Sequence, residues 1–392
     1  MKRPVYLTSD FAQLSLSSFL FFSSFNMLIP ELPAYLASLG GEKHIGLIIA
    51  LFTLTAGLSR PFSGKLADKI GRVPVMIFGV LVCVGICALY PLVTTVGGFL
   101  LLRFFHGFST GFTPTGTAAY VADIVPFNRR GEALGLHSLF AAVGMAAGPA
   151  LGGWIAAHYS LQVLFYSAAV VSFLSAALLF RLHETLPNPE KMAWKHLRLR
   201  KDEIIEKRVL NPSLVLFLMV FSFGIVLTII PDLSAHLGIA NKGLFFAVFT
   251  LSSLIIRIIA GKASDRFGRV PVLQMAALCM ACAMLVISLA TGVTGLMMGA
   301  LLFGFAIGMG SPTAAAWTID LSIDNYRGRA LATMYIALEA GIGIGALTSG
   351  WLYNSDSANF PLVFGTGGFF ALAAFLYLFG IPKHQRLRTL IR

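Results

Sequence analysis

The chain has 392 residues, of which 57% are hydrophobic and only 12% are charged, and its mean hydropathy is +0.82. A soluble domain carries about 25% charged residues, so this composition excludes a soluble enzyme or binding module. The apolar residues come in runs of about 20, the length that crosses the ~30 Å hydrocarbon core of a bilayer as a helix. The composition therefore predicts an all-α polytopic membrane protein.

Twelve such runs follow one another along the chain. They cover residues 11–33, 45–63, 74–93, 96–120, 133–157, 161–182, 212–236, 243–262, 271–291, 294–318, 330–353 and 361–382. Lys2 and Arg3 before the first run are also found in signal peptides. This run is too long for one and no small-residue cleavage site follows, so it is interpreted as a retained first span.

The net charge of +12 is distributed in a way that indicates a membrane rather than nucleic acid. Of the 29 Lys and Arg residues, only Lys43 and Lys242 fall in the odd-numbered loops, and Arg60, Arg103 and Arg257 lie inside spans. The remainder lie at the termini and in or beside the even-numbered loops. This positive-inside pattern predicts a multi-pass protein of the plasma (cytoplasmic or inner) membrane with both termini in the cytoplasm.

All four cysteines fall within predicted spans. Cys279 and Cys282 form a C-x-x-C pair, the spacing of redox and metal sites, but in an apolar helix the favoured interpretation is small buried filler. No Walker loop, HExxH, G-x-S-x-G or metal-spaced His or Cys cluster occurs. The sequence therefore predicts no enzyme activity, no cofactor and no metal.

An internal repeat divides the chain. GKLADKIGRVPV at residues 64–75 returns as GKASDRFGRVPV at 261–272, and the same shift of 197 relates Asp123 to Asp320 and Gly144 to Gly341. One unit is therefore used twice. We expect a six-helix unit at 1–182, a cytoplasmic linker at 183–211 and a second six-helix unit at 212–392. The linker is either an amphipathic helix on the membrane or a simple connection.

Two spans carry a polar stripe in the first unit. In span 1, Ser17, Ser24 and Glu31 recur every seven residues, so they share one helical face that should point into the bundle or to water. Span 4 carries a similar face, formed by Arg103, His106, Thr110, Thr113 and Thr117. An arginine inside a span costs about 2.5–3.5 kcal/mol on insertion scales. Arg103 therefore has a function in the cavity, or it snorkels outward or forms a structural pair.

Span 5 and span 11 are related by the repeat but differ in their polar and small residues. Span 5 is rich in glycine and contains Pro149, which predicts a groove for close helix packing with a kink. A purely structural role explains these glycines equally well. Span 11 instead carries Glu339 in its middle, one turn after Tyr335.

These motifs resemble the major facilitator superfamily over essentially the whole chain. Residues 64–72 resemble that family's loop 2–3 signature, and 261–269 its second copy. Residues 103–107, RFFHG, resemble its RxxQG motif with His in place of Gln. Pro30-x-x-Pro33 is similar to the span 1 end motif of twelve-span members. The signature of the drug:proton antiporter branch matches in span 5 at Gly135, Gly144, Gly148, Pro149, Gly152 and Gly153.

The resemblance implies two pseudo-symmetric six-helix bundles, acting as a monomer, around a central cavity that opens alternately to each side. It implies that Asp68 closes the outward-facing state by meeting the start of span 11, and that Arg72 pairs with Asp123. The expected conformational switch residues are Gly64, Asp68, Gly71, Arg72, Asp123, Asp265, Arg269 and Asp320. The expected cavity-lining residues are Ser24, Asn26, His106, Thr110 and Thr113.

Export by antiport needs a group that binds either a proton or the substrate. A carboxylate in a low-dielectric cavity near an arginine can do this, so Glu31 with Arg103 is the first candidate and Glu339 the second. Alternatively, Glu31 is simply solvated near the span end. The expected function is proton-coupled efflux of small lipophilic or cationic compounds. The rivals are a dedicated transporter of a sugar, siderophore, lipid or organic ion, and a membrane receptor without transport.

Overall fold

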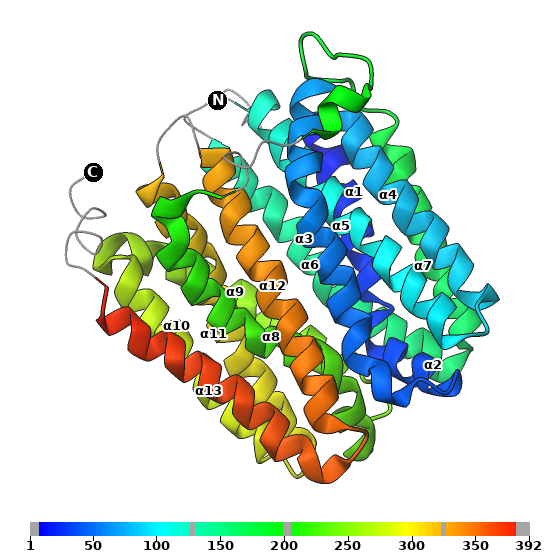
Figure 1. Ribbon diagram of the computed structural model, residues 1–392, viewed down its shortest axis with the longest axis vertical. Coiled ribbons are helices and arrows are strands. Elements are labelled where there is room, and N and C mark those ends of the chain that lie inside the picture. Colours follow the sequence, from blue (N-terminus) through cyan, green and yellow to red (C-terminus); the bar gives the residue numbers. More distant parts are fainter. Residues whose placement is uncertain (1–7, 126–129, 199–204, 323–326, 382–392) are drawn as a thin grey trace.

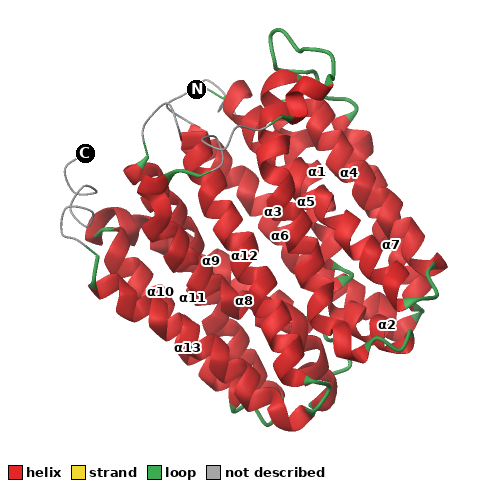
Figure 2. Cartoon of the chain, in the orientation of Figure 1, coloured by secondary structure: helices red, strands yellow, loops and turns green. Residues whose placement is uncertain are grey.

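The computed structural model describes residues 8–125, 130–198, 205–322 and 327–381, and within these ranges it contains helices and no strands (Figure 2). Twelve of the helices have 18 residues or more. The α-helices are α1 (Ser9–Asn26), α2 (Leu32–Ser38), α3 (Ile45–Lys69), α4 (Arg72–Leu89), α5 (Val96–Ile124), α6 (Arg130–His158), α7 (Leu161–Leu179), α8 (Leu210–His236), α9 (Leu244–Phe267), α10 (Arg269–Ser288), α11 (Val293–Leu321), α12 (Arg327–Tyr353) and α13 (Phe360–Phe379).

The predicted spans correspond to these helices one by one, with the first span divided. A 3₁₀ turn at Ile29–Glu31 separates α1 from the short α2, at the point where Pro30 and Pro33 interrupt backbone hydrogen bonding. Ten of the described helical segments are long and apolar enough to cross a membrane. The apolar stretch of α9 is shorter, at Leu244–Arg257, and α5 is outside this set. The chain is therefore a multi-pass membrane protein.

The repeated motif forms two equivalent helix-to-helix turns. Gly71 joins α3 to α4 with φ of 123°, and Gly268 joins α9 to α10 with φ of 90°. A side chain at either position would be strained, because L-residues rarely adopt positive φ. The single glycine lets one helix end and the next begin immediately. This explains why the glycine holds the same position in both copies of the motif.

The helices form two groups, the first half (α1–α7) and the second half (α8–α13), which lie side by side (Figure 1). In the first half α1 packs on α6 and α7, and α5 packs on α3 and α4; the second half repeats these contacts. The halves meet chiefly where α3 packs on α12 and where α6 packs on α9. These two helix pairs are related by the repeat, so the interface is pseudo-symmetric.

The two ends of this interface differ. We call the end at which residues 180–198 lie the linker end, and the opposite end, with the turns 39–44, 159–160 and 237–243, the far end. At the far end the halves touch backbone to backbone: a Cβ on Gly46 would meet Ala346, and a Cβ on Gly243 would meet the carbonyl of Pro149. At the linker end a Cβ on Gly64 or Gly261 would meet nothing within 4 Å. The halves are therefore closed together at the far end.

The linker contains no α-helix in its described parts, 183–198 and 205–209, which contradicts the amphipathic-helix alternative there. Its part 183–198 binds the first half instead. The Glu184 carboxylate accepts hydrogen bonds from the backbone N–H groups of Arg72 and Val73, both at 3.0 Å. It thereby caps the N-terminus of α4, where a carboxylate also compensates the helix dipole.

Candidate functional site

A buried ion pair joins the two halves near the middle of the helices. Arg60 on α3 donates from Nη2 to Oε1 of Glu339 on α12 at 2.7 Å, and their side chains are only 13% and 9% exposed. The guanidinium also lies over the Tyr335 ring, 4.8 Å from its centroid. Gly57 makes room for the pair, since a Cβ there would lie 3.3 Å from the Glu339 Cβ. The sequence indicated Glu339 as a candidate, and the structure adds Arg60 as its partner.

A second ion pair joins the halves at the far end. Lys242, in the turn before α9, donates from Nζ to Oε2 of Glu31 at 3.1 Å, and the Glu31 side chain is 9% exposed. The alternative in which Glu31 is merely solvated is therefore wrong for this state. Opening the far end has to separate Glu31 from Lys242, because they belong to different halves.

Arg103 does not pair with Glu31, contrary to expectation: within the described ranges no hydrogen bond or ion pair joins them. Arg103 is 2% exposed and lies inside the first half. Its Nε donates to the Ile48 carbonyl at 2.9 Å, its Nη1 donates to the Tyr90 hydroxyl at 3.3 Å, and its Cζ lies 4.6 Å from the Phe52 ring centroid. These contacts tie α5 to α3 and to the 3₁₀ turn Tyr90–Leu92 that follows α4, in agreement with the alternative of a structural partner.

The five residues expected to line a cavity are all buried, and their hydrogen bonds are made to residues of the first half. Ser24 contacts the Cys83 thiol at 3.5 Å, and Thr113 donates to the Met76 carbonyl at 3.3 Å, so both turn toward α4. Asn26 donates to the Phe22 carbonyl and Thr110 to the Gly107 carbonyl within their own helices. His106 is fully buried. These polar groups therefore satisfy one another and the backbone.

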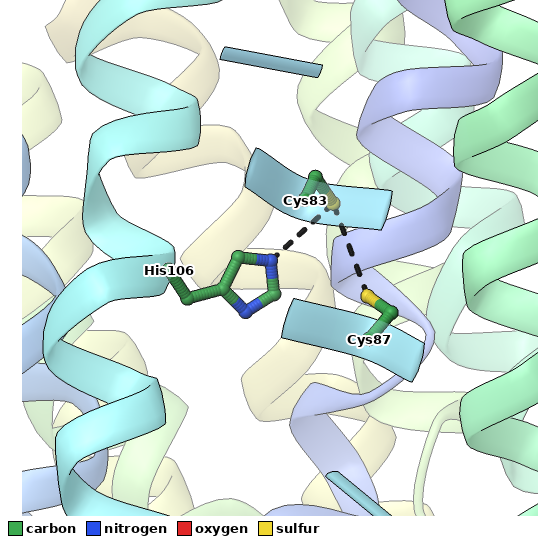
Figure 3. A group of neighbouring side chains, drawn as sticks. All are labelled: Cys83, Cys87 and His106. Carbon is green, nitrogen blue, oxygen red and sulfur yellow. Dashed lines mark hydrogen bonds between the residues drawn. The ribbon is translucent and has the colours of Figure 1, made fainter. Parts of the chain in front are cut away.

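His106 belongs to a compact group with Cys83 and Cys87 that the sequence did not reveal, because the histidine comes from another helix (Figure 3). The three ligand atoms lie within 4.8 Å of one another, and all three side chains are buried. His106 Nε2 is 3.3 Å from the Cys83 Sγ, and the two sulfurs are 3.9 Å apart. Two thiols and an imidazole form a donor set that suits Zn²⁺ or Cu⁺.

The surroundings of this group favour a hydrogen-bond cluster over a metal site. Arg103 can only donate, so His106 Nδ1, 3.4 Å from the guanidinium, accepts, and Nε2 carries the proton that points at Cys83. Every polar atom thus has a protein partner, and the permanent cation beside the imidazole opposes a metal ion. We interpret the group as the polar contact that holds α4 against α5.

This interpretation predicts that metal removal has no effect. A strong chelator should leave the unfolding temperature of the purified protein unchanged. His106→Leu should lower it, because the buried partners of His106 are left without a hydrogen bond, which reduces the free energy of unfolding by about 1–3 kcal/mol. Thermal unfolding in detergent measures both, with metal analysis of the same sample. A stoichiometric zinc or copper content, lost in the Cys83→Ala variant, would contradict it.

The expected switch pairs form in both halves. Arg72 Nε donates to Asp123 at 3.0 Å, and Arg269 Nε donates to Asp320 at 2.9 Å, which confirms the predicted pairings. Asp68 contacts Arg72 at 3.3 Å with its side chain 73% exposed. The side chain of its counterpart Asp265 and residues 323–326 before α12 lie outside what the structure describes. The contact of Asp68 with the start of span 11 therefore stays a prediction.

The glycines of span 5 pack α6 against α1. A Cβ on Gly144, Gly148 or Gly152 would meet backbone atoms of Phe19, Ser23 or Met27. Pro149 and Gly153 face the other half, where Gly243 and Asn241 approach them. The motif thus combines close packing within the first half with far-end contact to the second; the side chains around Gly135 are not described.

Gly148→Val should destabilise the protein by about 1–3 kcal/mol or more, because the added atoms have no space beside the Ser23 carbonyl. Gly85→Val on α4 is the matched control, since a Cβ there would meet nothing within 4 Å. Thermal unfolding of both variants in detergent measures the difference. Equal unfolding temperatures would show that the packing of α6 on α1 tolerates a side chain.

The C-x-x-C pair of α10 is not buried filler as a whole, so that prediction is wrong for one of its members. Cys282 is exposed on the surface of the bundle, and Cys279 is only half-buried, with its thiol 3.4 Å from the Leu302 carbonyl. In a membrane protein an outward-facing cysteine on an apolar helix meets lipid. No function is assigned to the pair.

Comparisons with known proteins agree with this architecture. The sequence model of the Major Facilitator Superfamily matches residues 14–212 and again 212–390. Multidrug resistance protein MdtG of Salmonella arizonae is 30% identical over 280 residues, which cover 67% of this chain and 68% of that protein. Multidrug resistance protein 2 of Bacillus subtilis is 27% identical over 270 residues, covering 66% and 67%.

Solved structures share the fold at low sequence identity. A crystal structure of the peptide transporter POT superposes with a TM-score of 0.78 at 16% identity, covering 96% of this chain and 95% of that one. A D-xylose-proton symporter gives 0.76 at 18% identity, covering 95% and 97%. The human organic anion transporter MFSD10 (TETRAN) gives 0.72 at 21% identity, covering 94% and 98%.

Proposed function

Because the chain belongs to the Major Facilitator Superfamily, and is thus a membrane transporter and not an enzyme, we propose that it exports small lipophilic or cationic compounds in exchange for protons. The relatives named multidrug resistance proteins support this class of substrate. The observation that carries the proposal is structural: two carboxylates, Glu31 and Glu339, are each buried at the boundary between the halves and paired with a cation of the opposite half.

This arrangement couples protonation to movement of the halves. An ionised carboxylate within a membrane is costly unless a cation lies beside it. When the far end opens, Glu31 loses Lys242, and protonation removes the charge that is then uncompensated. When the far end closes, Lys242 returns to Glu31 and favours the ionised form, so the proton leaves. Glu31 therefore takes up a proton while the far end is open and releases it when the transporter opens to the other side of the membrane. Glu339 with Arg60 is a second candidate for this coupling.

The orientation of the chain assigns its two ends to the two sides of the membrane. The positive-inside distribution of Lys and Arg supports an orientation with the linker end in the cytoplasm of a bacterial inner membrane. The conformation with the far end closed is then the inward-facing one, which accepts a compound from the cytoplasm or the inner leaflet. Arg72–Asp123 and Arg269–Asp320 lie at that end as the proposed conformational switch pairs.

Dye efflux from energised cells tests the proposal. Cells that express the protein should extrude a lipophilic cationic dye such as ethidium several-fold faster than cells with an empty vector, and an uncoupler should remove the difference because it collapses the proton gradient. Efflux that persists with the uncoupler, in cells whose gradient is shown to be lost, would refute proton antiport.

The main alternative is a dedicated transporter of a metabolite, in either direction. The structural neighbours support it to the extent that their names include peptide, D-xylose and organic anion transporters of the same fold. A well-expressed protein that exports no lipophilic or cationic dye, yet acidifies or alkalinises vesicles on addition of one metabolite, would favour this alternative.

A further inference from the structure

Arg257 is a second partly buried arginine, on α9, the helix that packs on α6 of the other half. Its Nε is buried without a hydrogen-bond partner, and across residues 8–125, 130–198, 205–322 and 327–381 it forms no ion pair. It does not face lipid: the exposed large side chains in the middle of α9 are those of Leu251, Ile255 and Ile259, and Arg257 lies about 200° around the helix from Ile255. An unpaired arginine inside a membrane protein is costly, so it requires an explanation.

The same inward face of α9 carries further signs of a binding surface. Thr250, two turns before Arg257, is 4% exposed, and its hydroxyl also has no partner within the described ranges. Gly261, one turn after Arg257, is exposed, and a Cβ there would meet nothing within 4 Å. The face therefore combines two unsatisfied polar groups with open space toward the linker end.

The internal repeat shows what such a guanidinium binds. Arg257 is related by the 197-residue shift to Arg60, and α6 packs on α9 as α12 packs on α3. Arg60 has the Glu339 carboxylate as its partner, but the residue equivalent to Glu339 is Ala142. The second site thus keeps the arginine of the pair and lacks the acid. Leu254 replaces Gly57, which gives this site an apolar wall.

We propose that Arg257 is the counter-ion for an acidic group of a transported compound, so that the substrates include amphipathic or zwitterionic acids. This rests on the proposed transport function and adds a substrate class to it. A carboxylate carried by the substrate takes the role that Glu339 has for Arg60, and its apolar body lies against Leu254 and the neighbouring part of α9. The hydroxyl of Thr250 supplies a second donor on the same face.

Rhodamine B and its ethyl ester provide a matched pair of probes, because they differ only in a free carboxylate. The purified chain in lipid nanodiscs should bind the acid about tenfold more tightly than the ester, the factor expected for a hydrogen bond to a charged group. Arg257→Gln should remove this ratio, and Arg257→Lys should retain part of it. Fluorescence polarisation measures all the affinities.

Ala142→Glu provides the sharper variant. It places a carboxylate of the protein at the position equivalent to Glu339, so it should weaken binding of the acid about tenfold by occupying Arg257. Ala142→Gln has the same size without the charge and should leave the acid preference intact. The double variant Ala142→Glu, Leu254→Gly reproduces the surroundings of Arg60. It controls for a steric effect of the new Glu side chain, because Gly at 254 provides the space that Gly57 provides beside Glu339.

The outcomes separate this inference from the function on which it rests. Equal binding of acid and ester by the wild type, or an unchanged ratio in the Arg257→Gln variant, would overturn the acid site while ester binding still supports the transporter. If the protein neither binds nor exports either dye, both the acid site and the proposed export of lipophilic or cationic compounds are refuted. Loss of acid preference in both Arg257→Gln and Ala142→Glu, with Ala142→Gln unaffected, supports the acid site.

Discussion

Glu31→Gln is expected to abolish the pH dependence of substrate binding. In an antiporter the proton and the substrate compete, so the wild type should bind a cationic dye more weakly as pH falls. Coupling between two sites is typically worth about 1–3 kcal/mol, or about 5–150-fold in affinity. Without a titratable group beside Lys242 this dependence should disappear, together with uncoupler-sensitive efflux. Dye binding in nanodiscs at a series of pH values measures the first effect, and efflux from cells measures the second.

Two controls separate proton coupling from simple closure of the far end. Lys242→Met breaks the same ion pair but keeps the carboxylate, so its substrate affinity should still depend on pH. Glu42→Gln removes an exposed carboxylate near the same end and should change nothing. If Lys242→Met and Glu31→Gln behave identically, Glu31 acts only as a partner for closure and does not carry the proton.

Glu339→Gln is expected to destabilise the protein strongly. Removal of one member of a buried ion pair costs about 3–5 kcal/mol, because the other charge stays buried without compensation. The double variant Arg60→Met, Glu339→Leu should recover most of this loss, since apolar replacements of both partners are often neutral or stabilising. Thermal unfolding in detergent of the wild type, Arg60→Met, Glu339→Leu and the double variant completes the cycle.

The double variant also tests function. If it is as stable as the wild type but exports no dye, then Glu339 or Arg60 acts in transport and not only in holding α3 against α12. Destabilisations that simply add in the double variant would show that the two residues do not interact energetically, contrary to their 2.7 Å contact.

The features that the sequence predicted well depend on local pattern. Helix positions follow from runs of about 20 apolar residues. The turns after α3 and α9 follow from the repeated loop signature, in which Gly71 and Gly268 adopt positive φ. The pairing Arg72–Asp123 could be predicted from the family motif, and the pairing Arg269–Asp320 from the internal repeat of that motif. These features need only neighbouring residues or a known signature.

The partners across the interface could not be predicted, because they depend on how the halves pack. Arg103 and Glu31 are both charged residues of the first half. Arg103 nevertheless binds the Ile48 carbonyl, whereas Glu31 binds Lys242 of the second half. Helical periodicity gives the face of a side chain but not which neighbouring helix it meets. The same limit hid the group formed by His106 with Cys83 and Cys87, whose members come from two helices.

The way the linker is anchored determines which piece of the chain it would accompany if the polypeptide were divided. Glu184 caps α4, and the backbone of Glu190 bonds to the Lys69 carbonyl, whereas Glu206 already bonds to Thr333 of α12. A cut between residues 198 and 205 would therefore leave both fragments with their anchoring contacts. Coexpressed fragments divided there should reassemble into an active transporter more readily than fragments divided before residue 184, whose first piece would lack the carboxylate that begins α4.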